Sequence, residues 1–119
     1  MKKYLFLLLF MLCSIKSNSQ TNSVTAKQAT VHISERVMVC DSVTDTFQSR
    51  DGTCFINFGG IYPNQEFTIV IFRSDLKQFY YNPAEYLKDK KVCVEGFIEL
   101  YKGKPQIVLK NADGIELRD

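Results

Sequence analysis

The sequence predicts an all-β domain with only short helices, and three observations indicate this class. Runs rich in Phe, Ile, Val and Thr recur along the chain, and these residues fit a pleated, half-buried surface. Within the runs apolar positions tend to recur every second residue, which is the strand period. Segments with Gly, Pro or Asn separate several of the runs, as expected of turns. A chain of 119 residues has room for one such domain.

An N-terminal segment is predicted to lie outside this domain. Lys2 and Lys3 precede the apolar run 4–13, and the small residues Ser17 and Ser19 follow it, which is typical of a secretory signal peptide. The run is shorter than the roughly 20 apolar residues that a membrane-spanning helix needs. We therefore predict a signal peptide over 1–19, a single domain over 20–119 without a membrane span, and export to the periplasm or the medium.

Cys13 raises the alternative of a lipid anchor. A lipobox has a small residue immediately before its cysteine, whereas this chain has Leu12 there. The sequence therefore favours cleavage after Ser19 over lipid attachment at Cys13.

Export would change the charge balance of the protein. Cleavage removes Lys2, Lys3 and Lys16 and no acid, so 15 basic residues become 12 against the same 13 acidic ones. A nearly neutral domain has no global attraction for a polyanion. A polyanion site would therefore require local clustering of basic residues.

The central feature is a hairpin expected over 53–73. Its two β-type runs, 53–58 and 67–72, enclose the segment GGIYPNQE, which is rich in turn-forming residues. Cys54, Ile56 and Phe58 share one face of the first run, which we assign to the core. Asn57 should then face outward, beside Phe55 as an exposed aromatic residue unless a loop covers it.

Before the hairpin we expect a short helix over 24–33 and the first strand over 36–43, where Val37, Val39 and Val43 share a face. The segment TDTFQSRDG, residues 44–52, is expected to be a polar loop. Its length and its Arg50 make it the first candidate binding loop.

After the hairpin, Asn82 is expected to cap a short helix that begins at Pro83. A strand over 91–99 follows, and Gly96 marks a bulge or a bend in it. A turn at 101–104 then leads to the last strands, at 105–110 and 115–117.

Five short strands with one helix between the third and the fourth are the element order of the OB-fold, a five-stranded Greek-key barrel. The segments VMVCDSV, FINFGGIYPNQEFTIVIF and PAEYLKDKKVCVEGFIELYKGKPQIVLKNADGIEL resemble a family of small bacterial OB-fold domains. Members occur as exported single domains and beside nuclease-type domains, and they are described as nucleic-acid-binding-like. The chain departs from this family at Ser34 and Asp41, where the family often has glycine, and at Cys54, where it has no cysteine.

The cysteines fit the same fold. In an OB barrel the first and fourth strands are neighbours, and Cys40 and Cys93 both lie on the strand face opposite the valines. An exported domain can keep a disulfide. We predict one between Cys40 and Cys93 if their Cα atoms lie within about 4.4–6.8 Å. Cys54 is expected to be a buried, unreactive thiol.

No catalytic or metal-binding motif is recognisable in the sequence. His32 is the single histidine and no Cys-x-x-Cys pair occurs, which disfavours a zinc site. The carboxylate and arginine pattern of thermonuclease-type OB barrels is not visible. We therefore expect no enzyme activity, no cofactor and no metal. The acids considered for catalysis are Asp41, Asp45, Asp51, Asp75, Glu95 and Glu99.

We expect instead a non-catalytic binding module that uses the usual OB surface, formed by the second and third strands and two adjoining loops. Single-stranded nucleic acid would need stacking aromatic residues and a local positive groove. The candidates are Phe55, Tyr62 and Tyr101 for stacking, Asn57 for hydrogen bonding, and Arg50, Lys102 and Lys104 for phosphates.

Two alternatives remain open at this point. Lys102 and Lys104 could be no more than a solvated hairpin tip. The ligand could instead be an envelope protein or an oligosaccharide, or the domain could only scaffold a larger assembly, and the nearly neutral charge of the mature domain favours these interpretations. The sequence defines no oligomeric state.

Overall fold

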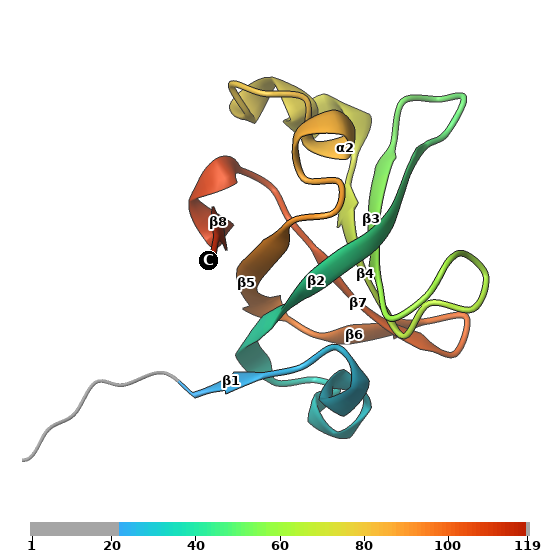
Figure 1. The fold of residues 1–119 in the computed structure, drawn as a ribbon, viewed down its shortest axis with the longest axis vertical. Coiled ribbons are helices and arrows are strands. Elements are labelled where there is room, and N and C mark those ends of the chain that lie inside the picture. Colours follow the sequence, from blue (N-terminus) through green and yellow to red (C-terminus); the bar gives the residue numbers. More distant parts are fainter. Residues whose placement is uncertain (1–21, 119) are drawn as a thin grey trace, which may run out of the picture.

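The computed structural model describes residues 22–118, and the predicted signal peptide at 1–19 lies outside this range. Eight strands form one sheet in the order β6-β7-β4-β3-β2-β5-β8, with β1 paired to β2 off this path. Only short helices accompany them (Figure 1). The predicted all-β class is confirmed.

The elements follow one another as β1 (Ser23–Val24), η2 (Lys27–His32), β2 (Arg36–Gln48), β3 (Cys54–Phe58), β4 (Phe67–Ile71), η3 (Arg73–Gln78), α2 (Pro83–Tyr86), β5 (Lys91–Phe97), β6 (Glu99–Tyr101), β7 (Lys104–Val108), η4 (Ala112–Gly114) and β8 (Ile115–Leu117). The elements labelled η are 3-10 helices. The helix expected over 24–33 is therefore shorter than predicted and follows a short strand.

β2 is a long strand that belongs to both halves of the barrel. Residues 36–42 pair antiparallel with β5, and residues 43–48 pair antiparallel with β3. The register shifts between Val43 and Asp45. Such a bulge bends a strand and increases its twist, which lets β2 exchange one partner for the other.

The prediction of a polar loop over 44–52 is therefore wrong. Residues 44–48 continue β2, and a tight turn replaces the rest, in which the Ser49 amide donates to Thr53 O at 2.8 Å. The bulge interrupts the period-two alternation, and that alternation was the signal that placed the end of the strand at Val43.

A bend between β5 and β6 closes the barrel. β5 ends at Phe97 and β6 begins at Glu99, so Ile98 alone separates them. Gly96 lies at this bend, as predicted, and a Cβ there would lie 2.6 Å from Cγ2 of Ile107 in β7. Only glycine allows this close approach. With β5 and β6 taken as one bent strand, the chain has the five barrel strands of the OB-fold.

The inside of the barrel is an apolar core, and α2 covers one end of it (Figure 1). The side chain of Asn82 accepts a hydrogen bond from the Glu85 amide, and Pro83 is the first helical residue, so the predicted cap is confirmed. The helix lies between the third and fourth barrel strands. The largest fully buried apolar side chains are Phe58, Phe67, Ile56, Ile69, Ile71, Leu87, Ile98 and Ile107.

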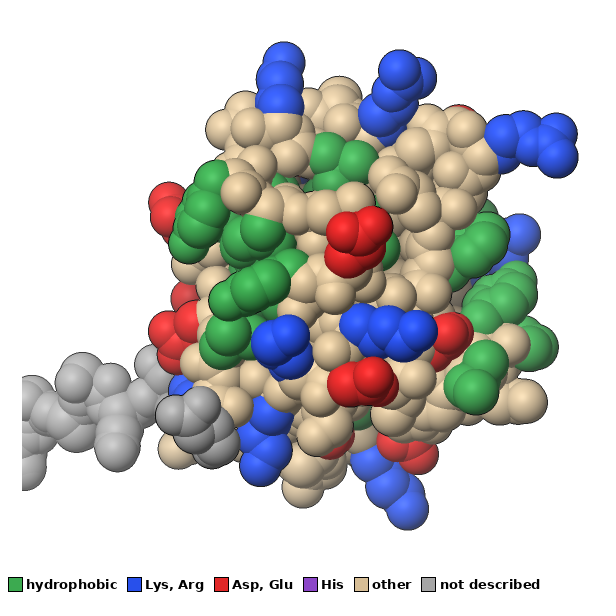
Figure 2. Space-filling view, turned by 45° about the horizontal axis from the view of Figure 1, so that its top comes forward, with side chains coloured by type: hydrophobic (Ala, Val, Ile, Leu, Met, Phe, Trp, Pro, Cys, Tyr) green, Lys and Arg blue, Asp and Glu red, His purple; other side chains and the backbone are tan. Residues whose placement is uncertain are grey.

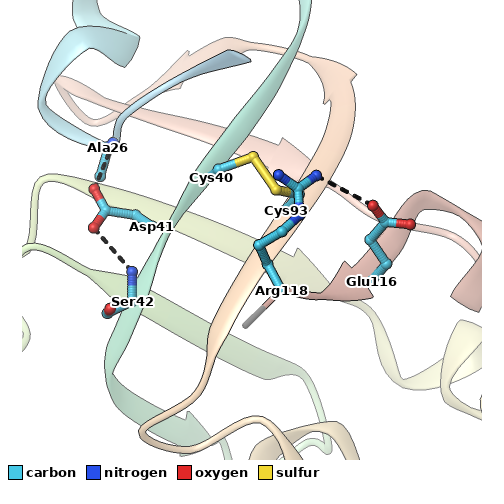
Figure 3. Close-up of a disulfide and its surroundings, with 7 residues drawn as sticks. All are labelled: Ala26, Cys40, Asp41, Ser42, Cys93, Glu116 and Arg118. Carbon is cyan, nitrogen blue, oxygen red and sulfur yellow. Dashed lines mark hydrogen bonds and ion pairs between the residues drawn. A yellow bond between two sulfur atoms is a disulfide. The ribbon is translucent and has the colours of Figure 1, made fainter.

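A disulfide joins Cys40 of β2 to Cys93 of β5 (Figure 3), which confirms the predicted pairing. The two residues are direct cross-strand partners. Their Cα atoms are 4.0 Å apart, slightly closer than the usual range of about 4.4–6.8 Å. Next to Cys40, the Asp41 carboxylate accepts a hydrogen bond from the Ala26 amide at 2.9 Å, which ties the segment before η2 to β2.

Cys54 is the buried thiol that the sequence predicted. Burial raises the pKa of its thiol to about 11, so the thiol stays protonated at neutral pH. Within 22–118, none of the helices has the length and apolar character required to cross a membrane.

Candidate functional site

A row of polar side chains crosses the outer face of the sheet. The strand register sets Asp45 opposite Asn57, Asn57 opposite Thr68, and Thr68 opposite Gln106. Cross-strand partners point to the same side of a sheet. These four side chains, from β2, β3, β4 and β7, therefore form one continuous polar row.

An aromatic pair lies beside this row. Phe47 is the cross-strand partner of Phe55, and their ring centroids are 6.1 Å apart with an interplanar angle of 26°. Phe47 is 56% exposed, whereas Phe55 is half-buried. The outward position expected for Phe55 is thus only partly realised, because Phe47 covers one side of its ring.

A groove of about 700 Å³ runs over this face. It is lined by the polar row, by the aromatic pair, by the β3–β4 loop and by the β6–β7 hairpin. Figure 1 shows the β3–β4 loop and the β6–β7 turn close together at one side of the barrel. The two segments supply Tyr62, Pro63, Gln65, Tyr101, Lys102 and Lys104 to the lining.

Asn57 lies on the outer face, as predicted, but its side chain is covered and only 1% exposed. Its Nδ2 donates to Oδ2 of Asp45 at 3.1 Å, and its Oδ1 accepts from the Thr68 hydroxyl at 2.8 Å. The strand period correctly put Asn57 on the outer face. The β3–β4 loop folds back over that face, however, and the Tyr62 amide also donates to Asp45. Asn57 therefore builds the floor of the groove and offers no free amide.

The β3–β4 loop is fixed at both of its ends. The Thr44 hydroxyl donates to Gly60 O at 2.8 Å, and it accepts from the Gly60 amide at 3.1 Å. At the other end, Nζ of Lys104 donates to Gln65 O at 2.8 Å. Gly60 has φ +138° and no room for a Cβ against Asn64 O. The loop is therefore a defined wall of the groove.

The same contact changes the role expected for Lys104, because its ammonium holds a backbone carbonyl and is not free for a phosphate. Lys102 differs: it lies 5.4 Å over the Tyr101 ring, and no residue in 22–118 accepts a hydrogen bond from it. Arg50 is exposed in the turn after β2 and is not among the lining residues. The structure thus gathers six of the seven candidate residues around one groove.

The groove carries little net charge. Its lining contains one carboxylate, on Asp45, and two ammonium groups, on Lys102 and Lys104. On the face shown in Figure 2, acidic and basic side chains are interspersed and form no continuous basic patch. Within 22–118 no group of three or more His, Cys, Asp or Glu side chains could hold a metal ion. The groove is therefore chiefly aromatic and hydrogen-bonding.

Two residues of the groove were not predicted from the sequence as part of a binding site, Asp45 as a lining acid and Phe47 as half of the aromatic pair. Both lie in the segment that was expected to be a loop. A signal was present, because Thr44, Thr46 and Phe47 are β-type residues. The other lining residues that were not predicted include Gln65, Thr68 and Gln106.

No family model and no curated protein matches this sequence. Comparison with solved structures finds 102 similar chains. One is a crystal structure of a protein described as an aspartyl-tRNA synthetase from Leishmania major Friedlin, with a TM-score of 0.52 and 7% sequence identity. The match covers 87% of this chain and 22% of that chain, so this chain spans about a fifth of that protein's length. Likeness at this identity shows the fold alone.

Proposed function

We propose that this protein is an exported, non-catalytic module that binds a short stretch of single-stranded nucleic acid in the groove. The observation that carries the proposal is the gathering of four aromatic side chains around one polar floor. This face of an OB-fold, with its two adjoining loops, is the one that binds oligonucleotides and oligosaccharides. Bases stack on such aromatic residues without regard to sequence. The four are Phe47, Phe55, Tyr62 and Tyr101.

The resemblance to exported OB-fold domains described as nucleic-acid-binding-like supports the same function. One of the solved structures that share the fold is named for a tRNA synthetase, and its likeness supports the fold on which this proposal depends. Export is supported by the Cys40–Cys93 disulfide, because disulfides persist in oxidising compartments.

Export makes a direct prediction about the N-terminus of the mature protein. The chain recovered from the native host's periplasm or medium should begin at Gln20, because Ser17 and Ser19 fit the small-residue cleavage positions. Mass spectrometry of the intact protein measures this mass. A lipid-modified Cys13, or an uncleaved chain in the cytoplasm, would contradict it.

The salt dependence of oligonucleotide binding tests the proposed ligand. Each phosphate contact to a single strand contributes about 0.7 to the slope of log K against log salt concentration. Lys102 is the exposed ammonium of the groove, so Lys102→Gln should flatten this slope by about 0.7. The measurement is fluorescence anisotropy with a labelled oligonucleotide over a series of salt concentrations.

Lys88→Gln is the matched control, since Lys88 is an exposed lysine outside the groove and its loss should leave the slope unchanged. A slope that Lys102→Gln does not change would remove Lys102 from the phosphate path. A wild-type protein that binds no oligonucleotide even at low salt would refute the proposed ligand.

A neutral oligosaccharide is the second candidate ligand. The observation that favours it is the low net charge of the groove, where Asp45 offsets one lysine and Lys104 is engaged by Gln65 O. OB-folds use the same face for oligosaccharides. Binding to a sugar would be nearly independent of salt, because no counterions are released.

A further inference from the structure

Asp45 is the one acid among the lining residues, and its surroundings determine which oxygen can meet a ligand. Oδ2 accepts from Nδ2 of Asn57 at 3.1 Å and from the Tyr62 amide at 3.2 Å. No residue in 22–118 donates a hydrogen bond to Oδ1. Asp45 is only half-buried. Oδ1 of Asp45 is therefore a hydrogen-bond acceptor that the polar floor leaves available to a ligand.

The other oxygen of the same carboxylate, Oδ2, determines how the amide of Asn57 is oriented. A carboxylate oxygen that meets an N–H donor leaves Asn57 no choice but to turn its Nδ2 toward Asp45. Its Oδ1 then faces Thr68, whose hydroxyl donates to it at 2.8 Å. The Thr68 oxygen in turn accepts from Nε2 of Gln65 at 3.2 Å. The donors of Gln65, Thr68 and Asn57 thus all point toward Asp45.

The Gln65 side chain, which donates to Thr68, is left with one unpaired atom by this direction. Gln65 is 7% exposed, and its Oε1 is buried without a hydrogen-bond partner in the described part of the chain. Turning the Gln65 amide around would set Oε1 against the Thr68 oxygen, whose hydrogen is already given to Asn57. Buried polar atoms without a partner are rare in proteins. The unpaired Oε1 of Gln65 is therefore consistent with the hydrogen-bond direction that runs from Gln65 through Thr68 and Asn57 to Asp45.

The aromatic pair places a base within reach of that acceptor. Phe47 follows Asp45 by two residues on the same face of β2, a distance of about 6.6 Å along the strand. A base stacked over Phe47 and Phe55 therefore brings its edge to the polar row. In nucleic-acid recognition, Asp and Glu accept from the N4 amino group of cytosine.

We infer that Asp45 determines base specificity, because Oδ1 of its carboxylate is a free acceptor for a stacked base, while the Asn57 and Thr68 donors beside it are engaged within the row. Bases with an exocyclic amino group, such as cytosine, bind in preference to thymine, whose O4 and O2 would face the carboxylate. This inference rests on the proposed function and names the class of base that the groove takes.

The test compares labelled oligo-dC with oligo-dT of equal length, about 12 nucleotides, which lies within the roughly 4–16 nucleotides that one OB-fold occupies. Binding is measured by fluorescence anisotropy at low salt and neutral pH. The two oligonucleotides have the same phosphate charge, so phosphate contacts contribute equally to both. We expect the wild-type protein to bind oligo-dC about tenfold more tightly.

Asp45→Asn should reverse this preference. Its single side-chain oxygen would remain with Asn57 and the Tyr62 amide, so its amino group would face the groove as a donor and meet O4 of thymine. Asp89→Asn is the matched control, because Asp89 is an exposed acid outside the groove. Its φ of 61° is tolerated by asparagine. That control should keep the preference for oligo-dC.

A second measurement leaves the protein unchanged, in case Asp45→Asn does not fold. Oligo-dC made with N4,N4-dimethylcytosine lacks both amino hydrogens and should bind as weakly as oligo-dT. Equal binding of oligo-dC and oligo-dT, a preference for oligo-dT, or full binding of the dimethylated strand would overturn the inference and leave the proposed function standing. Failure to bind either strand at low salt would overturn both.

Discussion

Replacing Cys40 and Cys93 together by alanine should lower the free energy of unfolding by about 4 kcal/mol. The disulfide closes a loop with a sequence separation of 53 residues, and a cross-link of that length removes much of the conformational entropy of the unfolded chain. It also joins the first half of β2 to β5, two barrel neighbours that are distant along the chain. Urea unfolding of the oxidised wild type and of the double variant measures the difference.

Reduction provides the control for this comparison. A reductant should bring the wild type close to the stability of the double variant, and it should leave the double variant unchanged because the buried Cys54 is the one cysteine that remains within 22–118. Equal urea midpoints for the oxidised wild type and the double variant would show that the disulfide contributes no stability.

Phe55→Ala should weaken binding of a single-stranded oligonucleotide by about 1–3 kcal/mol, which is roughly a 5- to 150-fold rise in Kd. Phe55 and Phe47 form the stacked pair of the groove, so removing one ring removes the platform for a base. Fluorescence anisotropy at fixed salt measures the change. Thermal unfolding should accompany it, because Phe55 is half-buried and its loss will also cost some stability.

Two further variants separate stacking from loss of apolar surface. Phe55→Leu keeps an apolar side chain without a π face, so it should lose most of the affinity that Phe55→Ala loses. Phe97→Ala removes a more exposed ring, since Phe97 is 50% exposed on β5 and lies outside the groove. An affinity loss in Phe97→Ala equal to that in Phe55→Ala would place the binding surface elsewhere on the barrel.

The position of the candidate site could be predicted from the sequence better than the role of each residue in it. Tyr62, Tyr101 and Lys102 could be assigned to the groove because they lie in turns of the element order expected for an OB-fold. Phe47 and Asp45 could not, since the bulge after Val43 hides the strand that carries them. Arg50 was misplaced for the same reason: the loop assigned to it is mostly strand.

The sequence by itself determined the features that depend on interactions within a few residues. The β-type residues predicted β3 and β4, and the period of two identified the core face of β3. The Asn82 side chain capped α2, and the missing Cβ of Gly96 permitted the bend before β6. The Cys40–Cys93 pairing needed one further premise, the adjacency of the first and fourth barrel strands.

Only the tertiary structure decided which polar groups remain available to a ligand. Asn57 is buried because the β3–β4 loop folds back over β2, and Lys104 is engaged because it reaches Gln65 O, 39 residues earlier in the chain. Both effects depend on hydrogen bonds between segments that are far apart in the sequence, and no local sequence pattern predicts such pairs. The direction of the row that ends at Asp45 is likewise set by hydrogen bonds across strands, which exist only once the barrel has closed.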